Sequence, residues 1–333
     1  MIIRFFKSSY LPQYVALILI GMALWAPALF WSDPDSKEHI DLLEPGYHLL
    51  LSLFPNYTFI GILFSFLITM GTALLFNFVL EKHDLTSRNS LLPAFVFIVF
   101  TGLFPELHGL HQSLIPTLLI LLLLNNILEM YNVDEGYTQI FYAGVLIAIA
   151  SLFSFQSLFY ILLVFLAFFV FRIYTWREWI IVLLGVVNVY LLLGVYLFWT
   201  DKLNLALQNY GIYFTEISFY KFQGPYDFIS LLLITMTIIL SLWSLLKVLV
   251  RYSDHILVIR KKITVILWFF FTAVLITIIS GRANETFNYL LITALASITC
   301  IGLVQLKKTI WMDVTLGIFL ILALINNYSQ LLS

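Results

Sequence analysis

The chain has 333 residues, of which 62% are hydrophobic and 11% are charged, and its formal net charge is −1. This composition excludes an ordinary soluble domain and predicts an all-α, polytopic transmembrane protein. The charges form no basic patch, so no nucleic-acid partner is expected. Cys300 is the single cysteine, which excludes a disulfide framework and a cysteine-based metal site.

Apolar runs set the number of membrane spans. A span needs about 17 to 25 residues, and shorter runs are tolerated in buried hairpins. We expect about eleven spans, at residues 13–31, 57–80, 91–104, 112–130, 138–153, 156–171, 177–199, 228–250, 263–280, 286–305 and 309–327. Residues 1–333 then form a single transmembrane domain, with an acidic outer loop and surface helix at 32–56 and a second outer loop at 200–227.

The loop charges predict the orientation of these spans. With the N-terminus inside, 13 of the 17 basic residues fall on the inner side, and the outer side holds only Lys37, Lys202, Lys221 and Arg282. Cytoplasmic loops of membrane proteins carry such an excess of Lys and Arg. We therefore expect a multi-pass protein of a bacterial inner membrane, with its N-terminus inside and membrane lipids as its surroundings.

The first outer segment, residues 31–54, gathers acidic residues between two apolar runs. Its carboxylates are Asp33, Asp35, Glu38, Asp41 and Glu44. Pro34 favours an extended conformation at Asp33, so Asp33 and Asp35 are presented at the membrane surface, where a carboxylate can act as a general base or hold a divalent cation. Apolar residues at helical spacing then predict an amphipathic surface helix: Leu42, Leu43, Tyr47, Leu50, Leu51 and Phe54. The alternative is a solvated loop with no catalytic role.

The second outer segment, residues 104–111, is short and contains Glu106, His108 and His111. A glutamate with two histidines is a plausible ligand group for a divalent metal such as zinc, manganese or iron, and His39 of the first segment could join it. The alternative is that these side chains cap helix ends at the interface.

The third outer segment, residues 280–289, interrupts two apolar runs and contains Arg282. A guanidinium binds phosphate oxygens in pairs, so Arg282 is the candidate for contact with a lipid phosphate. The alternative is that Arg282 pairs with Glu285 or with an ordinary phospholipid headgroup.

These features together resemble the polyprenyl-phosphate-sugar-dependent glycosyltransferases of the GT-C fold. The likeness rests on the N-in first span, the acidic loop with its surface helix, the short paired middle spans, and the sequence RANETFNYLL at residues 282–291. That sequence is similar to the Arg-Tyr-Leu-Leu entry to a late span in those enzymes. The resemblance implies Asp33 or Asp35 as the acceptor-activating base, Glu106 as a second acidic partner and Arg282 near the donor phosphate. An Asp-Pro-Asp sequence replaces the Asp-Glu pair of that family. Blocks such as MIIRFF and FSFQSLFY also resemble an uncharacterised inner-membrane family of Bacteroidota.

Three functions follow as hypotheses. The first is a GT-C-like enzyme that transfers a sugar from polyprenyl phosphate at the periplasmic face. The second is a non-catalytic subunit that scaffolds an envelope or secretion complex through protein partners. The third is a lipid or solute transporter, although such proteins place polar residues in broken helices near the middle of the bilayer, and such residues are scarce here.

Overall fold

The computed structural model describes residues 2–31, 44–54, 59–131, 136–173, 175–204, 206–208, 228–280, 288–305 and 310–329. Every regular element in these ranges is an α-helix or a 3-10 helix, which confirms the all-α class. The predicted apolar runs correspond to α2 (Leu11–Trp31), α4 (Phe59–Lys82), α5 (Leu92–Thr101), α6 (Leu114–Met130), α7 (Tyr137–Phe153), η2 with α8 (Phe155–Tyr160 and Ile161–Phe171), α9 (Trp176–Trp199), α11 (Phe228–Val250), α12 (Leu257–Ser280), α13 (Tyr289–Val304) and α14 (Ile310–Ser329). The remaining short elements are α1 (Ile2–Phe6), α3 (Pro45–Leu53), η1 (Pro105–Leu107) and η3 (Tyr252–Asp254).

Five of these helices are long and apolar enough to cross a membrane: α2, α4, α9, α11 and α12. The others in the apolar set are shorter, and α5 has only 10 residues. The predicted run 91–104 is therefore only partly helical, because α5 ends at Thr101 and the chain is extended again at Phe104. The chain is a membrane protein by the length and composition of its helices.

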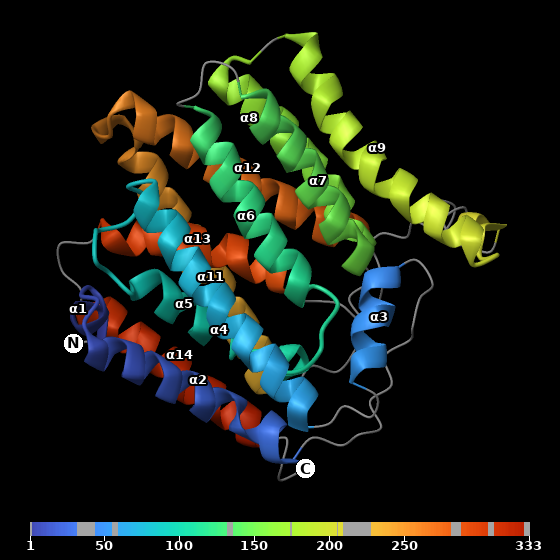
Figure 1. Cartoon of the computed structure of the whole chain (residues 1–333). Coiled ribbons are helices and arrows are strands. Elements are labelled where there is room, and N and C mark those ends of the chain that lie inside the picture. Colours follow the sequence, from blue (N-terminus) through green and yellow to red (C-terminus); the bar gives the residue numbers. More distant parts are fainter. Residues whose placement is uncertain are drawn as a thin grey trace.

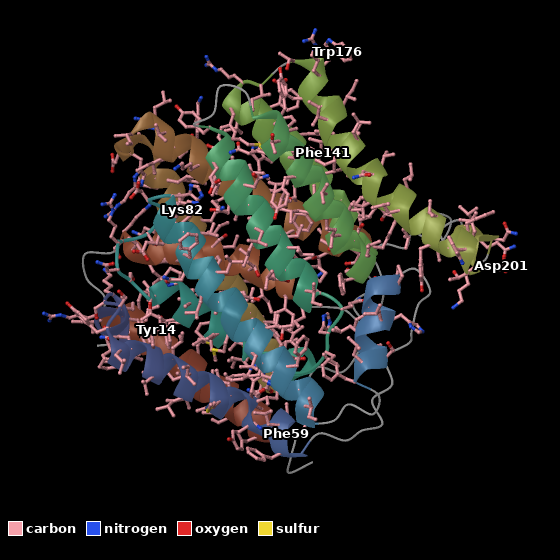
Figure 2. All side chains as sticks on the ribbon, viewed as in Figure 1. Tyr14, Phe59, Lys82, Phe141, Trp176 and Asp201 are labelled. Carbon is pink, nitrogen blue, oxygen red and sulfur yellow. The ribbon has the colours of Figure 1, made fainter. Side chains whose placement is uncertain are left out.

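Consecutive helices of the apolar set run in opposite directions, so the bundle has two ends (Figure 1). We call them the α1 end and the α3 end, after the short helix that lies at each. At the α1 end, Lys82 closes α4 and forms an ion pair with Glu129 of α6. At the α3 end, Ser230 near the start of α11 donates a hydrogen bond to Asn326 near the end of α14. Figure 2 labels Lys82 and Phe59, which mark the two ends of α4.

Basic residues are distributed unequally between the two ends. Among the described residues, the α1 end holds Arg4, Lys7, Lys82, Arg88, Arg172, Arg177, Lys247, Arg251, Arg260, Lys261 and Lys262, and the α3 end holds Lys202. The three-dimensional arrangement thus brings together the basic loops that the sequence places on one side of the membrane.

The interior of the bundle is built on α5 and α13. All residues of α5 are buried, and in α13 all but Leu291 and Val304 are buried. By contrast, α9 lies at the edge, with only Val182 and Gly185 buried. The central helices are surrounded by protein, which is the condition under which a helix too short to span can be held at membrane depth.

Two amide side chains of α14 hold the end of α5. Asn326 Nδ2 donates to Leu103 O at 3.2 Å, and Asn327 Nδ2 donates to Gly102 O at 2.9 Å. The last carbonyls of a helix have no partner within the helix, and in an apolar environment they need other donors. The two asparagines supply those donors at the point where α5 ends.

The same stretch of α14 compensates for a proline in α2. Pro27 lies inside α2 and has no N–H, which frees the carbonyl of Ala23 four residues earlier. Tyr328 Oη donates to Ala23 O at 3.4 Å, and Asn327 Nδ2 also donates to Leu24 O at 3.2 Å. The end of α14 therefore ties α2 and α5 together.

Candidate functional site

The predicted amphipathic helix of the first outer segment exists as α3. Tyr47 and Leu50 are buried against the protein, whereas Leu49 and Leu53 on the other face are 60% and 64% exposed. Figure 1 shows α3 beside the ends of α6 and α7. The helix therefore has one face in contact with the bundle and one apolar face turned outward.

Glu44, directly before α3, does not fit the alternative of a solvated acidic loop. Its side chain is only 4% exposed, and its Oε1 accepts a hydrogen bond from Phe155 N at 3.1 Å. Two residues further on, a Cβ at Gly46 would lie 3.0 Å from Leu152 O, so the chain passes close to the end of α7. The carboxylate thus joins the start of α3 to the start of η2.

The second outer segment forms a compact turn around η1. Ser113 N and Ser113 Oγ both lie within hydrogen-bond distance of His111 Nδ1, at 3.1 Å and 2.7 Å. The Ser113 hydroxyl in turn accepts from Tyr289 N at 3.1 Å. In this arrangement the His111 Nδ1 accepts, so the proton of the neutral ring is on Nε2. Burial lowers the pKa of His111 to about 4.

His108 is placed differently. Its ring lies on Trp25, with 4.6 Å between the ring centroids, and burial lowers its pKa to about 3. Its Nε2 is buried and has no hydrogen-bond partner among the described residues. A buried polar atom without a partner is uncommon in folded proteins.

Tyr289 joins the third outer segment to the second. Its hydroxyl donates to Leu107 O at 2.7 Å, and its ring contacts His111 with 6.1 Å between centroids. Asn288 caps α13 by accepting from Leu291 N at 2.9 Å. The start of α13 is therefore seated against η1.

The first segment meets the second as well. Tyr47 Oη donates to Leu110 O at 2.8 Å in a buried position. The turn at residues 104–113 is thus held from two sides, by Tyr47 of α3 and by Tyr289 of α13. All three outer segments that the sequence singles out have described residues at this turn or beside it. Tyr47, His111, Ser113 and Tyr289 are linked through the turn, whereas Glu44 binds Phe155 N and His108 contacts Trp25; we call these six residues the polar layer.

Part of this polar layer lies inward from the end of the longest neighbouring helix. Thr69 Oγ1 is 3.4 Å from Tyr289 Oη, and Thr69 comes ten residues after Phe59, where α4 begins. Ten residues of helix correspond to about 15 Å. Tyr289 Oη therefore lies about 15 Å inward from the α4 terminus. Leu110, whose carbonyl Tyr47 binds, lies beside Gly61 and so close to that terminus.

Several predicted site residues fall outside the described part of the chain. Asp33, Asp35, His39 and Arg282 belong to this group, and of Glu106 only the backbone, in η1, is described. Their described flanks are in the layer or next to it: Glu44 follows the acidic loop, and Asn288 follows the Arg282 segment. The catalytic role of Asp33, Asp35 and Glu106 and the phosphate contact of Arg282 stay predictions.

The metal prediction gains no support from the described residues. Among them, no group of three or more His, Cys, Asp or Glu side chains could hold a metal ion. His108 contacts Trp25, and His111 uses Nδ1 for Ser113, so each of the two histidines has its own separate surroundings. A site formed by His108, His111 and His39 stays a prediction.

Sequence analysis missed the pair Asn326–Asn327 and the burial of Glu44. A signal for the asparagines was present, because two adjacent amides inside an apolar run need partners within the membrane. No signal marked Glu44, since its partner Phe155 is 111 residues away.

Comparisons with family models, with curated proteins and with solved structures give no match for this chain.

Proposed function

We propose that this chain is a GT-C-like glycosyltransferase of a bacterial inner membrane, which transfers a sugar from a polyprenyl-phosphate donor at the periplasmic face. The observation that carries the proposal is the convergence of the three outer segments on one polar layer. Tyr47 and Tyr289 bind the same turn, at Leu110 O and Leu107 O. A transferase needs its general base and its phosphate-binding group close together. Tyr47 follows the segment of the candidate bases Asp33 and Asp35, and Tyr289 follows the segment of Arg282, so the two contacts bring these segments to the same turn.

The roles of the individual residues follow from their chemistry. Asp33 or Asp35 would accept the proton of the attacking hydroxyl, which raises the electron density on the oxygen that forms the new glycosidic bond. Arg282 would stabilise the negative charge that develops on the departing lipid phosphate. Glu106, in η1, would be a second acidic group facing the acceptor. No step in this scheme requires a metal ion.

The charge distribution supports the orientation. The α1 end holds all the described basic residues except Lys202, and such an excess of Lys and Arg is typical of the cytoplasmic side. The α3 end, with the polar layer, would then face the periplasm. In this orientation the proposed site would lie in the leaflet that presents polyprenyl-phosphate sugars to periplasmic acceptors.

The proposal is tested by mass spectrometry of the lipids that co-purify in a mild detergent. Wild type is expected to retain a polyprenyl-phosphate species, and the double variant Asp35→Asn with Arg282→Gln is expected to lose it. A matched control is Asp201→Asn with Lys202→Gln, which removes the same charges at the same end; Asn tolerates the left-handed conformation of Asp201 (φ 55°). Ordinary phospholipid alone in all three samples would contradict the proposal.

A scaffold is the second candidate, and a specific observation favours it. Tyr47, His111, Ser113 and Tyr289 use their polar groups to bind one another or the backbone, as structural residues do. Under this hypothesis the double variant leaves the lipid content unchanged, and a defined protein partner co-purifies in stoichiometric amount.

A further inference from the structure

The first half of α9 packs closely on the bundle. Trp179 stacks on Phe165 of α8. Gly185 faces Gly144 of α7: a Cβ at Gly144 would lie 2.2 Å from Val182 O, and one at Gly185 would lie 2.5 Å from Phe141 O. Only glycine allows two helix backbones to come this near. Beyond this contact α9 diverges from α7, as Figure 1 shows, and runs out toward Asp201 (Figure 2).

The divergence leaves a groove with a volume of about 460 Å³ between α9, η2 and the residues that follow α9. Its described lining has no charged side chain and includes Phe155 and Leu158 of η2, Tyr190 and Gly194 of α9, and Leu203 and Leu207 after α9. The groove lies at the α3 end of the molecule, because η2 and the last turns of α9 both lie there.

The chemistry of the groove selects an apolar occupant. The one hydroxyl in the lining, Tyr190 Oη, is engaged by Ser151 Oγ at 2.8 Å. Water enters a cavity only where it finds several polar partners, and this lining offers none that is free. The groove opens to the surface, since its lining residues Val187 and Leu207 are 55% and 61% exposed. In a membrane, hydrocarbon is the material in contact with such an apolar surface.

One lining residue connects the groove to the polar layer. Phe155 lines the groove, and its N–H is bound by the buried carboxylate of Glu44. We propose that this groove binds one hydrocarbon chain of a lipid from the leaflet at the α3 end. Only the identity of that lipid, a polyprenyl phosphate, rests on the proposed function.

The experiment uses the full chain in vesicles that contain a phosphatidylethanolamine with a photoreactive diazirine in one acyl chain. Gly194 lines the groove and has open space where a Cβ would be added, so Gly194→Phe fills the groove without a clash. Gly71 of α4 is exposed and also has open space, so Gly71→Phe is the matched control. After illumination, labelled peptides are identified by mass spectrometry.

We expect label concentrated at residues 155–158 and 190–197 in wild type and in Gly71→Phe, and most of that label lost in Gly194→Phe. Two results would overturn the inference: equal labelling of all lipid-facing helices in the three proteins, or label on those helices with none in the groove, which would mean that protein fills it. Addition of an isoprenoid phosphate as competitor separates the two proposals. Displacement of the groove label supports the polyprenyl donor. If the label is retained, the groove still binds phospholipid, and the result contradicts only the proposed glycosyltransferase function.

Discussion

Replacement of Asn327 by leucine tests whether α5 is held by side chains of α14. The Nδ2 of Asn327 donates to Gly102 O at 2.9 Å and to Leu24 O at 3.2 Å. Gly102 O has no other donor among the described residues, and a buried carbonyl left without one costs about 1–3 kcal/mol. The lost bond to Leu24 O adds about 0.6 kcal/mol, the average for polar contacts between membrane helices. Asn327 Oδ1 is itself buried and has no partner in the described part of the chain, so its removal offsets part of this cost.

Together these contributions predict that Asn327→Leu lowers the free energy of unfolding by about 2 kcal/mol, which lowers the folded-to-unfolded ratio by a factor of about 30. The assay is SDS titration in mixed micelles, followed by tryptophan fluorescence. Tyr328→Phe is the matched control, since it removes only a 3.4 Å hydrogen bond at an exposed position of the same helix, and it should cost less than about 0.6 kcal/mol. Equal stability of Asn327→Leu and wild type would refute the role assigned to α14.

Three further predictions concern the polar layer and the α7–α9 contact. Tyr289→Phe removes one of two donors to a carbonyl of η1, so it should lower the free energy of unfolding by about 1 kcal/mol in the same titration. The pKa values of His108 and His111, about 3 and about 4 in the fold, lie below the ordinary 6.5. The unfolded chain therefore binds protons that the folded chain does not, and stability falls as the pH drops below about 6.5, by up to about 1.4 kcal/mol per pH unit for each histidine. Thermal unfolding at pH 7.5 and pH 5 checks this. Between the two pH values, His108→Phe should lose less stability than wild type, and an identical loss would contradict the lowered pKa of His108. Gly144→Leu clashes with the backbone of α9 and should destabilise by about 1–3 kcal/mol, whereas Gly194→Leu, with open space at its Cβ, should not.

The sequence was sufficient to predict where the apolar helices lie, because each long run without charges left the chain no other way to satisfy its backbone in a membrane. It was not sufficient for the end of α5. The apolar run continues through Gly102, Leu103 and Phe104, and the helix ends at Thr101, where Asn326 and Asn327 provide donors more than two hundred residues away. Contacts over such a separation leave no local pattern.

The candidate site was likewise only partly predictable from the sequence. The three outer segments were recognisable from their polar residues within an apolar chain, and the structure brings their flanks together. The partners inside the layer were not recognisable, since Tyr47, Ser113 and Tyr289 bind backbone groups that no side-chain pattern marks. The expected grouping of His108 with His111 followed from their spacing, yet the turn at η1 directs the two rings to different neighbours.

The length of α5 also has a consequence for how the protein is made. Ten apolar residues are too few to be inserted as an independent span, so α5 must enter the bilayer together with α6, as a hairpin. The side chains that donate hydrogen bonds to the carbonyls at its end are on α14, which is synthesised last of the described helices. Until α14 arrives, the nascent chain carries an unsatisfied helix end within the membrane. Assembly of the centre of the bundle is therefore completed only after translation of the last helix.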